Sequence, residues 1–127
     1  MDNFYLKPTS KTPSINFDKE KGVFEISGRS IPENSIDFYK PVLDWLDNYI
    51  DQPLPETILE IKLEYFNTSS SKCLVDIFRK FEILHRNGKD TKIRWYYEEE
   101  DEDMLESGED FKGIIKLPLN LVKIKEL

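Results

Sequence analysis

The sequence contains one cysteine, Cys73, one histidine, His85, and five scattered glycines. A single thiol cannot close an internal disulfide, and one cysteine with one histidine cannot assemble a Cys/His zinc site. The glycines lie too far apart to form a phosphate-binding loop of the P-loop or dinucleotide type. The chain therefore falls outside the disulfide-rich, zinc-binding and common nucleotide-binding classes.

Long hydrophobic runs and an excess of positive charge are also missing. No apolar stretch approaches the ~20 residues that span a bilayer, and the opening MDNFYLKPTSK lacks the apolar stretch of a secretory signal. We therefore expect a cytoplasmic protein. Eighteen basic residues against 25 acidic residues give a net charge of -7, which disfavours nucleic acid and anionic membranes as partners.

The material for a core is present. Of the 127 residues, 39% are hydrophobic and 13% are aromatic, enough apolar surface to offset the entropy lost when a compact chain becomes ordered. A length of this order suits one core. We expect a single domain that spans residues 1–127.

Hydrophobic spacing predicts an alternation of strands and helices. A hairpin is expected over residues 14–28, with Ile15 and Phe17 facing Val23, Phe24 and Ile26. The elements expected after it are a helix over 34–51, a strand over 57–66, a helix over 70–87 capped by Gly88, a strand over 92–98, a short helix over 101–113 and a strand over 118–124. This order predicts an α/β fold, a mixed sheet with an N-terminal hairpin and helices mainly on one face.

The helix expected over residues 34–51 has an unusually wide apolar face. Pro41 lies inside the pattern and predicts a kink or a broken first turn. A partner or a neighbouring element of the same chain could cover one edge of this face. One stripe consists of Ile36, Tyr39, Leu43, Leu46 and Ile50, and a second stripe beside it consists of Phe38, Val42, Trp45 and Tyr49.

No constellation of catalytic residues can be drawn, and we assign no catalytic, cofactor-binding or metal-binding residue. His85 lies near a helix end, where an imidazolium favours the helix dipole, and Cys73 fits a packed thiol. The run of six acidic residues from Glu98 to Asp103 lacks the interleaved glycine of a calcium loop. We interpret it as a solvated face that begins a helix.

Four consecutive hydroxyl residues follow Asn67 where a strand gives way to a helix: Thr68, Ser69, Ser70 and Ser71. One side-chain oxygen is enough to cap a helix, so capping explains any one of them but not four. A helix N-terminus also stabilises an attached phosphate, and Lys72 adds a cation nearby. Capping and phosphorylation both remain possible interpretations of these residues.

Four segments resemble the SiaC family of biofilm-regulating phosphoproteins. They are ISGRSIPENSIDFYKPVLDWL (26–46), LEYFNTSSSKCLVDI (63–77), IRWYYEEEDEDML (93–105) and GEDF (108–111). With the hairpin they cover nearly the whole chain, and YFNTSSSK followed by WYYEEEDEDM is a specific pairing. The family is similar in architecture to the STAS domains of anti-sigma factor antagonists, so the resemblance implies a STAS-like domain.

The resemblance implies a phosphorylation-controlled, non-enzymatic switch. Thr68 would be phosphorylated by a SiaB-type protein kinase and dephosphorylated by a SiaA-type phosphatase, and the unphosphorylated form would bind and activate a SiaD-type diguanylate cyclase. In that scheme the chain binds no cofactor. We place the docking surface on Asn67, Thr68, Ser69, Ser70 and Lys72, with Asp76 and Arg79 on the same helix.

Two alternatives stay open. A STAS-like binding module could regulate a different output protein, such as an anti-sigma factor or a receptor phosphatase. An enzyme that uses carboxylates of the Glu98 to Asp103 run would need a deep pocket in which those groups converge.

Overall fold

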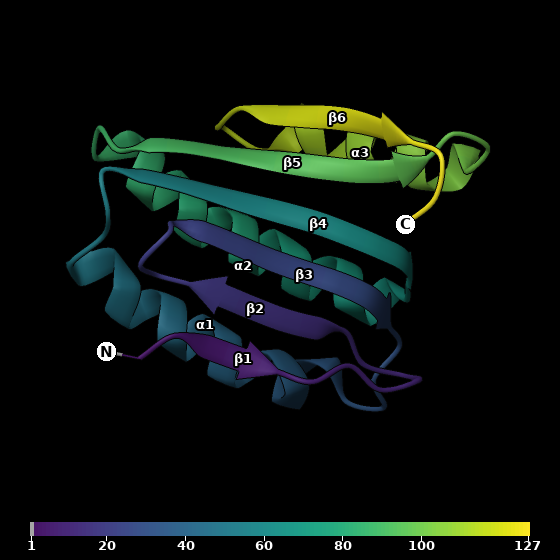
Figure 1. Ribbon diagram of the computed structural model, residues 1–127, viewed down its shortest axis with the longest axis horizontal. Helices are drawn as coiled ribbons and strands as arrows, with labels where there is room; N and C mark the ends of the chain where they lie inside the picture. The colour runs from purple at the N-terminus through teal and green to yellow at the C-terminus, as the bar shows by residue number, and fades with distance from the viewer. Residues whose placement is uncertain (1) are drawn as a thin grey trace.

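In the computed structural model, which describes residues 2–127, six strands form one sheet and three helices lie behind it (Figure 1). The strands follow one another across the sheet in chain order. The first two pairs of strands are antiparallel and the remaining three pairs are parallel. The elements are β1 (Phe4–Leu6), β2 (Ser14–Asp18), β3 (Val23–Ser30), α1 (Ser35–Asp51), β4 (Glu56–Phe66), α2 (Thr68–Arg86), β5 (Asp90–Glu98), α3 (Glu102–Ile114) and β6 (Leu119–Ile124).

This mixed α/β architecture confirms the predicted fold class, and the hairpin pairs β2 with β3 as expected. Ile15, Phe17, Phe24 and Ile26 are fully buried between the sheet and the helices, as alternation along the two strands requires. The pattern did not predict β1, because a strand of three residues is too short to show a period of two.

Helix α1 buries only the middle of its wide apolar face, and its first turn differs from the prediction. Its buried stripe is Tyr39, Val42, Leu46 and Tyr49, whereas Ile36 is 75% exposed. The buried residues come from both apolar stripes, Tyr39 and Leu46 from one and Val42 and Tyr49 from the other, so Ile36 lies at an exposed edge of the wide face. Of the two effects expected of Pro41, a kink or a broken first turn, the broken turn is absent, since the chain stays helical through Pro41. Both Pro41 and Asp37 are exposed, so water can reach the Asp37 carbonyl that lacks the usual helical donor.

Strand β1 covers part of the wide face of α1. The indole of Trp45 donates a hydrogen bond to the Asp2 carbonyl at 2.9 Å, and its ring lies 6.3 Å from that of Phe4. A neighbouring element of the same chain thus covers this edge of the helix. That leaves the exposed part of α1 near its first turn, around Ile36.

Helix α2 follows its prediction closely. It ends in a Schellman motif, in which the Lys89 N–H bonds to the Leu84 carbonyl and the Gly88 N–H to the His85 carbonyl, both at 3.1 Å. Gly88 has φ +84°, the left-handed conformation that glycine adopts without strain. The expected core stripe is buried and consists of Leu74, Ile77, Phe78, Phe81 and Leu84. None of the helices in residues 2–127 is long and apolar enough to cross a membrane.

Gly108 allows α3 to lie directly on the sheet. A Cβ added there would stand 2.5 Å from Trp95 Cδ1 and 2.7 Å from Leu121 Cδ2. Gly108→Ala should therefore lower the free energy of unfolding by roughly 1–3 kcal/mol, because the helix must move away from Trp95. Urea denaturation measures the change. The matched control is Gly113→Ala, where the added Cβ meets no atom within 4 Å beyond its chain neighbours and its own helix backbone; equal losses in both variants would contradict the packing argument.

Glu82 in α2 forms a hydrogen bond with Lys116 in the loop that follows α3. Its buried carboxylate accepts hydrogen bonds from the Lys116 N–H at 2.6 Å and from Arg79 Nη1 at 2.8 Å. Burial alone would raise the pKa of Glu82, but these two donors together hold the pKa below its ordinary value of 4.5. Since the folded-state pKa is depressed, the stabilisation is complete above the unfolded-state value and is lost as the pH falls through the folded-state value.

Glu82→Gln should therefore lose stability at neutral pH, by roughly 1–2 kcal/mol. The difference between the unsubstituted protein and the variant should shrink as the pH falls below about 4.5. Urea midpoints measured from pH 7 to pH 3 test this. A difference that stays constant over that range would mean that the charge of Glu82 contributes nothing.

Candidate functional site

All three helices begin at one edge of the sheet, the edge formed by the carboxyl ends of the parallel strands (right side of Figure 1). Thr68 is the first residue of α2 at this edge. Its predecessor Asn67 is the N-cap, because the Asn67 Oδ1 accepts a hydrogen bond from the Ser70 N–H at 2.9 Å. Capping by Asn67 leaves the Thr68 hydroxyl free of that role.

The hydroxyls that follow Asn67 differ in accessibility. Thr68 is exposed and, within residues 2–127, its hydroxyl makes no side-chain hydrogen bond. Ser69 is also exposed, but its hydroxyl lies 2.7 Å from Ser35 Oγ and donates to Asn67 Oδ1 at 3.2 Å. Thr68 therefore combines exposure with a free hydroxyl, which is what a modifying enzyme needs.

Ser70 does not belong to the docking surface on which we placed it. The residue is 0% exposed, and its hydroxyl lies 2.7 Å from Ser30 Oγ and donates to the Ser30 carbonyl at 3.1 Å. It points inward because it is two residues on from Thr68, about 200° around the helix. Ser70 cannot touch a partner and supports the edge from beneath. Ser71 is half-buried.

A buried hydroxyl cluster lies under the first turn of α2. The Tyr39 hydroxyl is 2.6 Å from Ser30 Oγ, which is in turn bonded to Ser70. Burial raises the pKa of Tyr39 to about 12, so the phenol stays protonated at physiological pH. These bonds join β3, α1 and α2, and the bond between Ser35 and Ser69 ties the starts of the two helices together. The position of Thr68 is consequently fixed by the core.

The remaining predicted residues lie along the exposed side of α2. Lys72 and Asp76 follow Thr68 at intervals of four residues, and both are exposed. They therefore continue the surface that Asn67, Thr68 and Ser69 begin. Arg79 is exposed on the same side, but it pairs with Glu82 at 2.8 Å and donates to the Ile114 carbonyl at 3.4 Å. Its contacts within the chain place it at the margin of this surface.

The acidic run begins α3, as predicted. The Asp101 carboxylate caps the helix by accepting from the Met104 N–H at 3.0 Å, and Glu102 and Asp103 occupy the first turn. Negative charge there favours the helix dipole. In the part of the chain that the structure describes, no group of three or more His, Cys, Asp or Glu residues could hold a metal ion.

Cys73 and His85 also behave as their positions in α2 predict. Cys73 is buried, and burial together with the charge of Asp76 raises the pKa of its thiol. A thiol of this kind is an unreactive packing group. His85 is exposed in the last turn of the helix. Neither residue adds a nucleophile or a base to the sheet edge where the helices begin.

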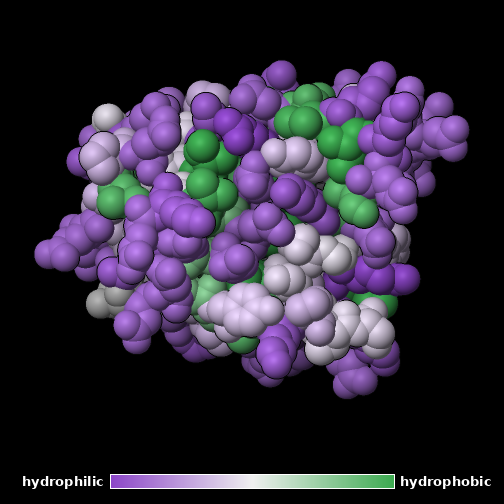
Figure 2. Space-filling view, viewed as in Figure 1, coloured by the Kyte–Doolittle hydropathy of each residue, from purple (hydrophilic) through white to green (hydrophobic). Residues whose placement is uncertain are grey.

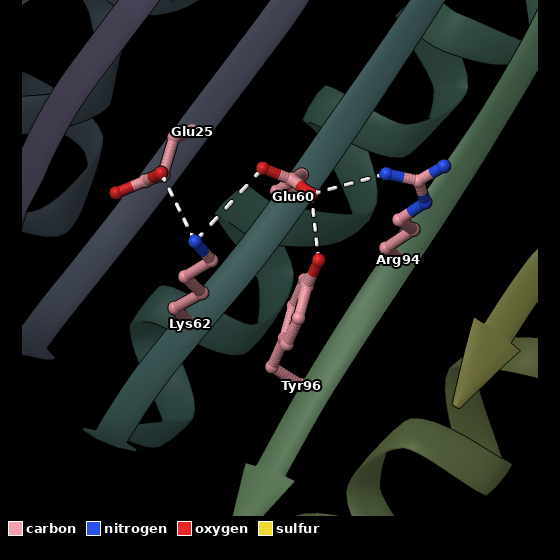
Figure 3. Close-up of polar contacts among 5 residues, drawn as sticks. All are labelled: Glu25, Glu60, Lys62, Arg94 and Tyr96. Atoms are coloured by element: carbon pink, nitrogen blue, oxygen red, sulfur yellow. Dashed lines mark hydrogen bonds and ion pairs between the residues drawn. The ribbon is translucent and has the colours of Figure 1, made fainter. Parts of the chain in front are cut away.

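A second polar cluster lies on the sheet face that carries no helices (Figure 3). Glu60 accepts from the Tyr96 hydroxyl at 2.7 Å and from Arg94 at 3.4 Å, while Lys62 bridges Glu60 and Glu25 at 3.9 and 3.3 Å. Burial and the bond to Glu60 raise the pKa of Tyr96. The groups neutralise one another on a largely hydrophilic face (Figure 2), so we assign the cluster to stability.

The model of the SiaC family regulatory phosphoprotein matches residues 6–124. The chain belongs to the SiaC family. An uncharacterized protein of Pseudomonas aeruginosa strain UCBPP-PA14 is 31% identical over 118 residues, which make up 93% of this chain and 94% of that protein.

Solved structures of SiaC agree with the fold. SiaC of Pseudomonas aeruginosa is similar with a TM-score of 0.88 and 28% identity, over 98% of this chain and 100% of that one. A second match comes from the crystal structure of diguanylate cyclase SiaD in complex with its activator SiaC from the same species. It has a TM-score of 0.89 and 30% identity, and covers 95% of this chain and 99% of the matched chain.

Proposed function

We propose that this SiaC family protein is a non-enzymatic, cytoplasmic switch whose unphosphorylated form binds and activates a diguanylate cyclase. The observation that carries the proposal is the exposed, free hydroxyl of Thr68 at the start of α2. Family membership supports a regulatory phosphoprotein. The relative crystallised with the cyclase SiaD as its activator supports the choice of output partner.

Phosphorylation of Thr68 would act as the release signal. The phosphate adds about -1.5 to -2 charges and three acceptor oxygens. At the first position of a helix these charges meet the positive end of the dipole, so the fold of the modified protein stays intact. A docking surface loses water when the partner binds, and an unpaired dianion in it is costly. The same group is therefore tolerated by the free protein and rejected by the complex.

A SiaB-type protein kinase and a SiaA-type phosphatase are the enzymes that we propose for the two directions. Thr68 suits them because its hydroxyl is exposed, whereas Ser70 is buried and the Ser69 hydroxyl is held by two hydrogen bonds. We therefore place the modification at Thr68. The neighbouring serines are structural in this scheme.

Titration of the unphosphorylated protein into a diguanylate cyclase from the same host tests the proposal. We expect saturable binding by calorimetry and a rise in the rate of cyclic-di-GMP synthesis. Mass spectrometry of protein from the native host should find phosphate on Thr68. Absence of both binding and stimulation would refute the choice of cyclase and favour a different output protein, such as an anti-sigma factor or a receptor phosphatase.

A further inference from the structure

Two large apolar side chains are exposed at the same sheet edge as the Thr68 hydroxyl. Ile36 is 75% exposed in the first turn of α1, and Tyr65 is 53% exposed near the end of β4. The bond between Ser35 and Ser69 places the first turn of α1 against that of α2. Tyr65 precedes the N-cap of α2 by two residues. Thr68 thus shares the sheet edge where the helices begin with two apolar side chains that the core does not use.

Neither side chain is required by local structure. The first turn of an exposed helix favours polar residues, and a β-branched side chain such as Ile36 lowers helix propensity. At the end of β4, the pairing passes from Gly28 with Leu63 to Arg29 with Tyr65, so Glu64 is an extra residue. This bulge turns Phe66 toward Trp95, with ring centroids 5.9 Å apart, and leaves Tyr65 outside.

The surface beside Tyr65 carries carboxylates for which the described residues supply no ion-pair partner. A cleft of about 350 Å³ is lined by Tyr65 and by the carboxylates of Glu64, Asp101 and Asp103, with Phe66, Met104 and Ser107. Within residues 2–127 none of these three carboxylates belongs to an ion pair. An apolar anchor bordered by carboxylates that form no ion pair is complementary to an apolar segment bordered by cations.

We propose that Ile36 and Tyr65 are the apolar anchors of the docking surface around Thr68, and that a basic amphipathic helix of the output partner occupies it. This inference rests on the proposed function. Apolar side chains of that helix cover Ile36 and Tyr65, while its Lys or Arg side chains reach the cleft lined by Glu64 and Asp103. A phosphate on Thr68 would then lie on the same surface as two anchors that must lose water when the partner binds.

The test compares pairs of variants with similar exposure. Ile36→Ser and Tyr65→Ser should each weaken cyclase binding about tenfold in calorimetry, the loss expected for a buried apolar anchor. The matched controls are Ile114→Ser and Tyr5→Ser, because these residues are 51% and 56% exposed at other places on the molecule. Both controls should bind with unchanged affinity. All four sites are exposed, so thermal unfolding should remain within a few degrees of the unsubstituted protein.

A charge variant tests the basic character of the partner helix separately from the apolar anchors. Glu64→Gln with Asp103→Asn should slow association at low ionic strength and flatten its dependence on salt. Unchanged affinity in both anchor variants, while the unsubstituted protein binds, would overturn the inference and leave the proposed function standing. An effect confined to self-association, measured by sedimentation, would also overturn it. If the unsubstituted protein fails to bind, the proposed function fails first and the inference with it.

Discussion

Thr68→Asp should lose activation of the cyclase while Thr68→Ala keeps it. The carboxylate places a charge where we propose that the partner removes water, and the cost of an unpaired buried charge is roughly 2 kcal/mol or more. This corresponds to a loss of affinity of roughly 30-fold. Alanine removes only an exposed hydroxyl that makes no side-chain hydrogen bond within the described residues. The rate of cyclic-di-GMP synthesis and the dissociation constant measure the effect.

Asn87→Asp is the control for this prediction. Asn87 caps the opposite end of the same helix and is exposed, so the variant adds the same charge to the protein at a distance of about 28 Å. It should activate the cyclase normally. Equal losses in Thr68→Asp and Asn87→Asp would assign the effect to net charge, and equal activation by Thr68→Asp and Thr68→Ala would remove Thr68 from the docking surface.

Ser70→Asp should unfold the protein or bring it close to unfolding. Ser70 is 0% exposed and bonds to the hydroxyl and the carbonyl of Ser30. A carboxylate there has no cation to pair with and breaks the buried hydroxyl cluster, at a cost of about 3–5 kcal/mol. Since whole domains are stable by only ~5–15 kcal/mol, this is a large fraction of the total.

Thr68→Asp is the matched control for the stability of Ser70→Asp. The two substitutions introduce the same side chain two residues apart, yet an acidic residue in the first turn of a helix should change stability by only a few tenths of a kcal/mol. Urea denaturation of both variants measures the difference. Comparable stabilities would mean that the first turn of α2 is open enough to expose Ser70, and phosphorylation could not then be restricted to Thr68 by burial.

The strands and helices could be predicted from the sequence because their periodicities are strong. Alternation places Phe24 and Ile26 inside the sheet, and the spacing in α2 identifies its buried face. The orientation of α1 could not be predicted in the same way. Its two apolar stripes are nearly equivalent and the buried residues come from both, so the exposure of Ile36 depends on how β1 and the sheet pack against the helix.

The position of the candidate site could be predicted from the sequence, but the accessibility of its individual residues could not. A run of hydroxyls after Asn67 marks the start of a helix, and the helix begins there. Whether each hydroxyl is buried or hydrogen-bonded depends on Ser30 and Ser35, which are distant in sequence and close in the fold. The exposure of Tyr65 depends on a bulge at Glu64 that the alternating pattern does not reveal. Local sequence patterns therefore predict where the helices begin, and tertiary contacts determine which side chains are exposed there.

The affinity of the cyclase for protein that carries authentic phosphothreonine at position 68, before and after phosphatase treatment, is the decisive measurement. The treated sample should bind and stimulate synthesis of cyclic-di-GMP, and the untreated sample should bind at least about 30-fold more weakly with an unchanged unfolding transition. Equal binding by the two samples, with the phosphate verified by mass spectrometry, would contradict the account.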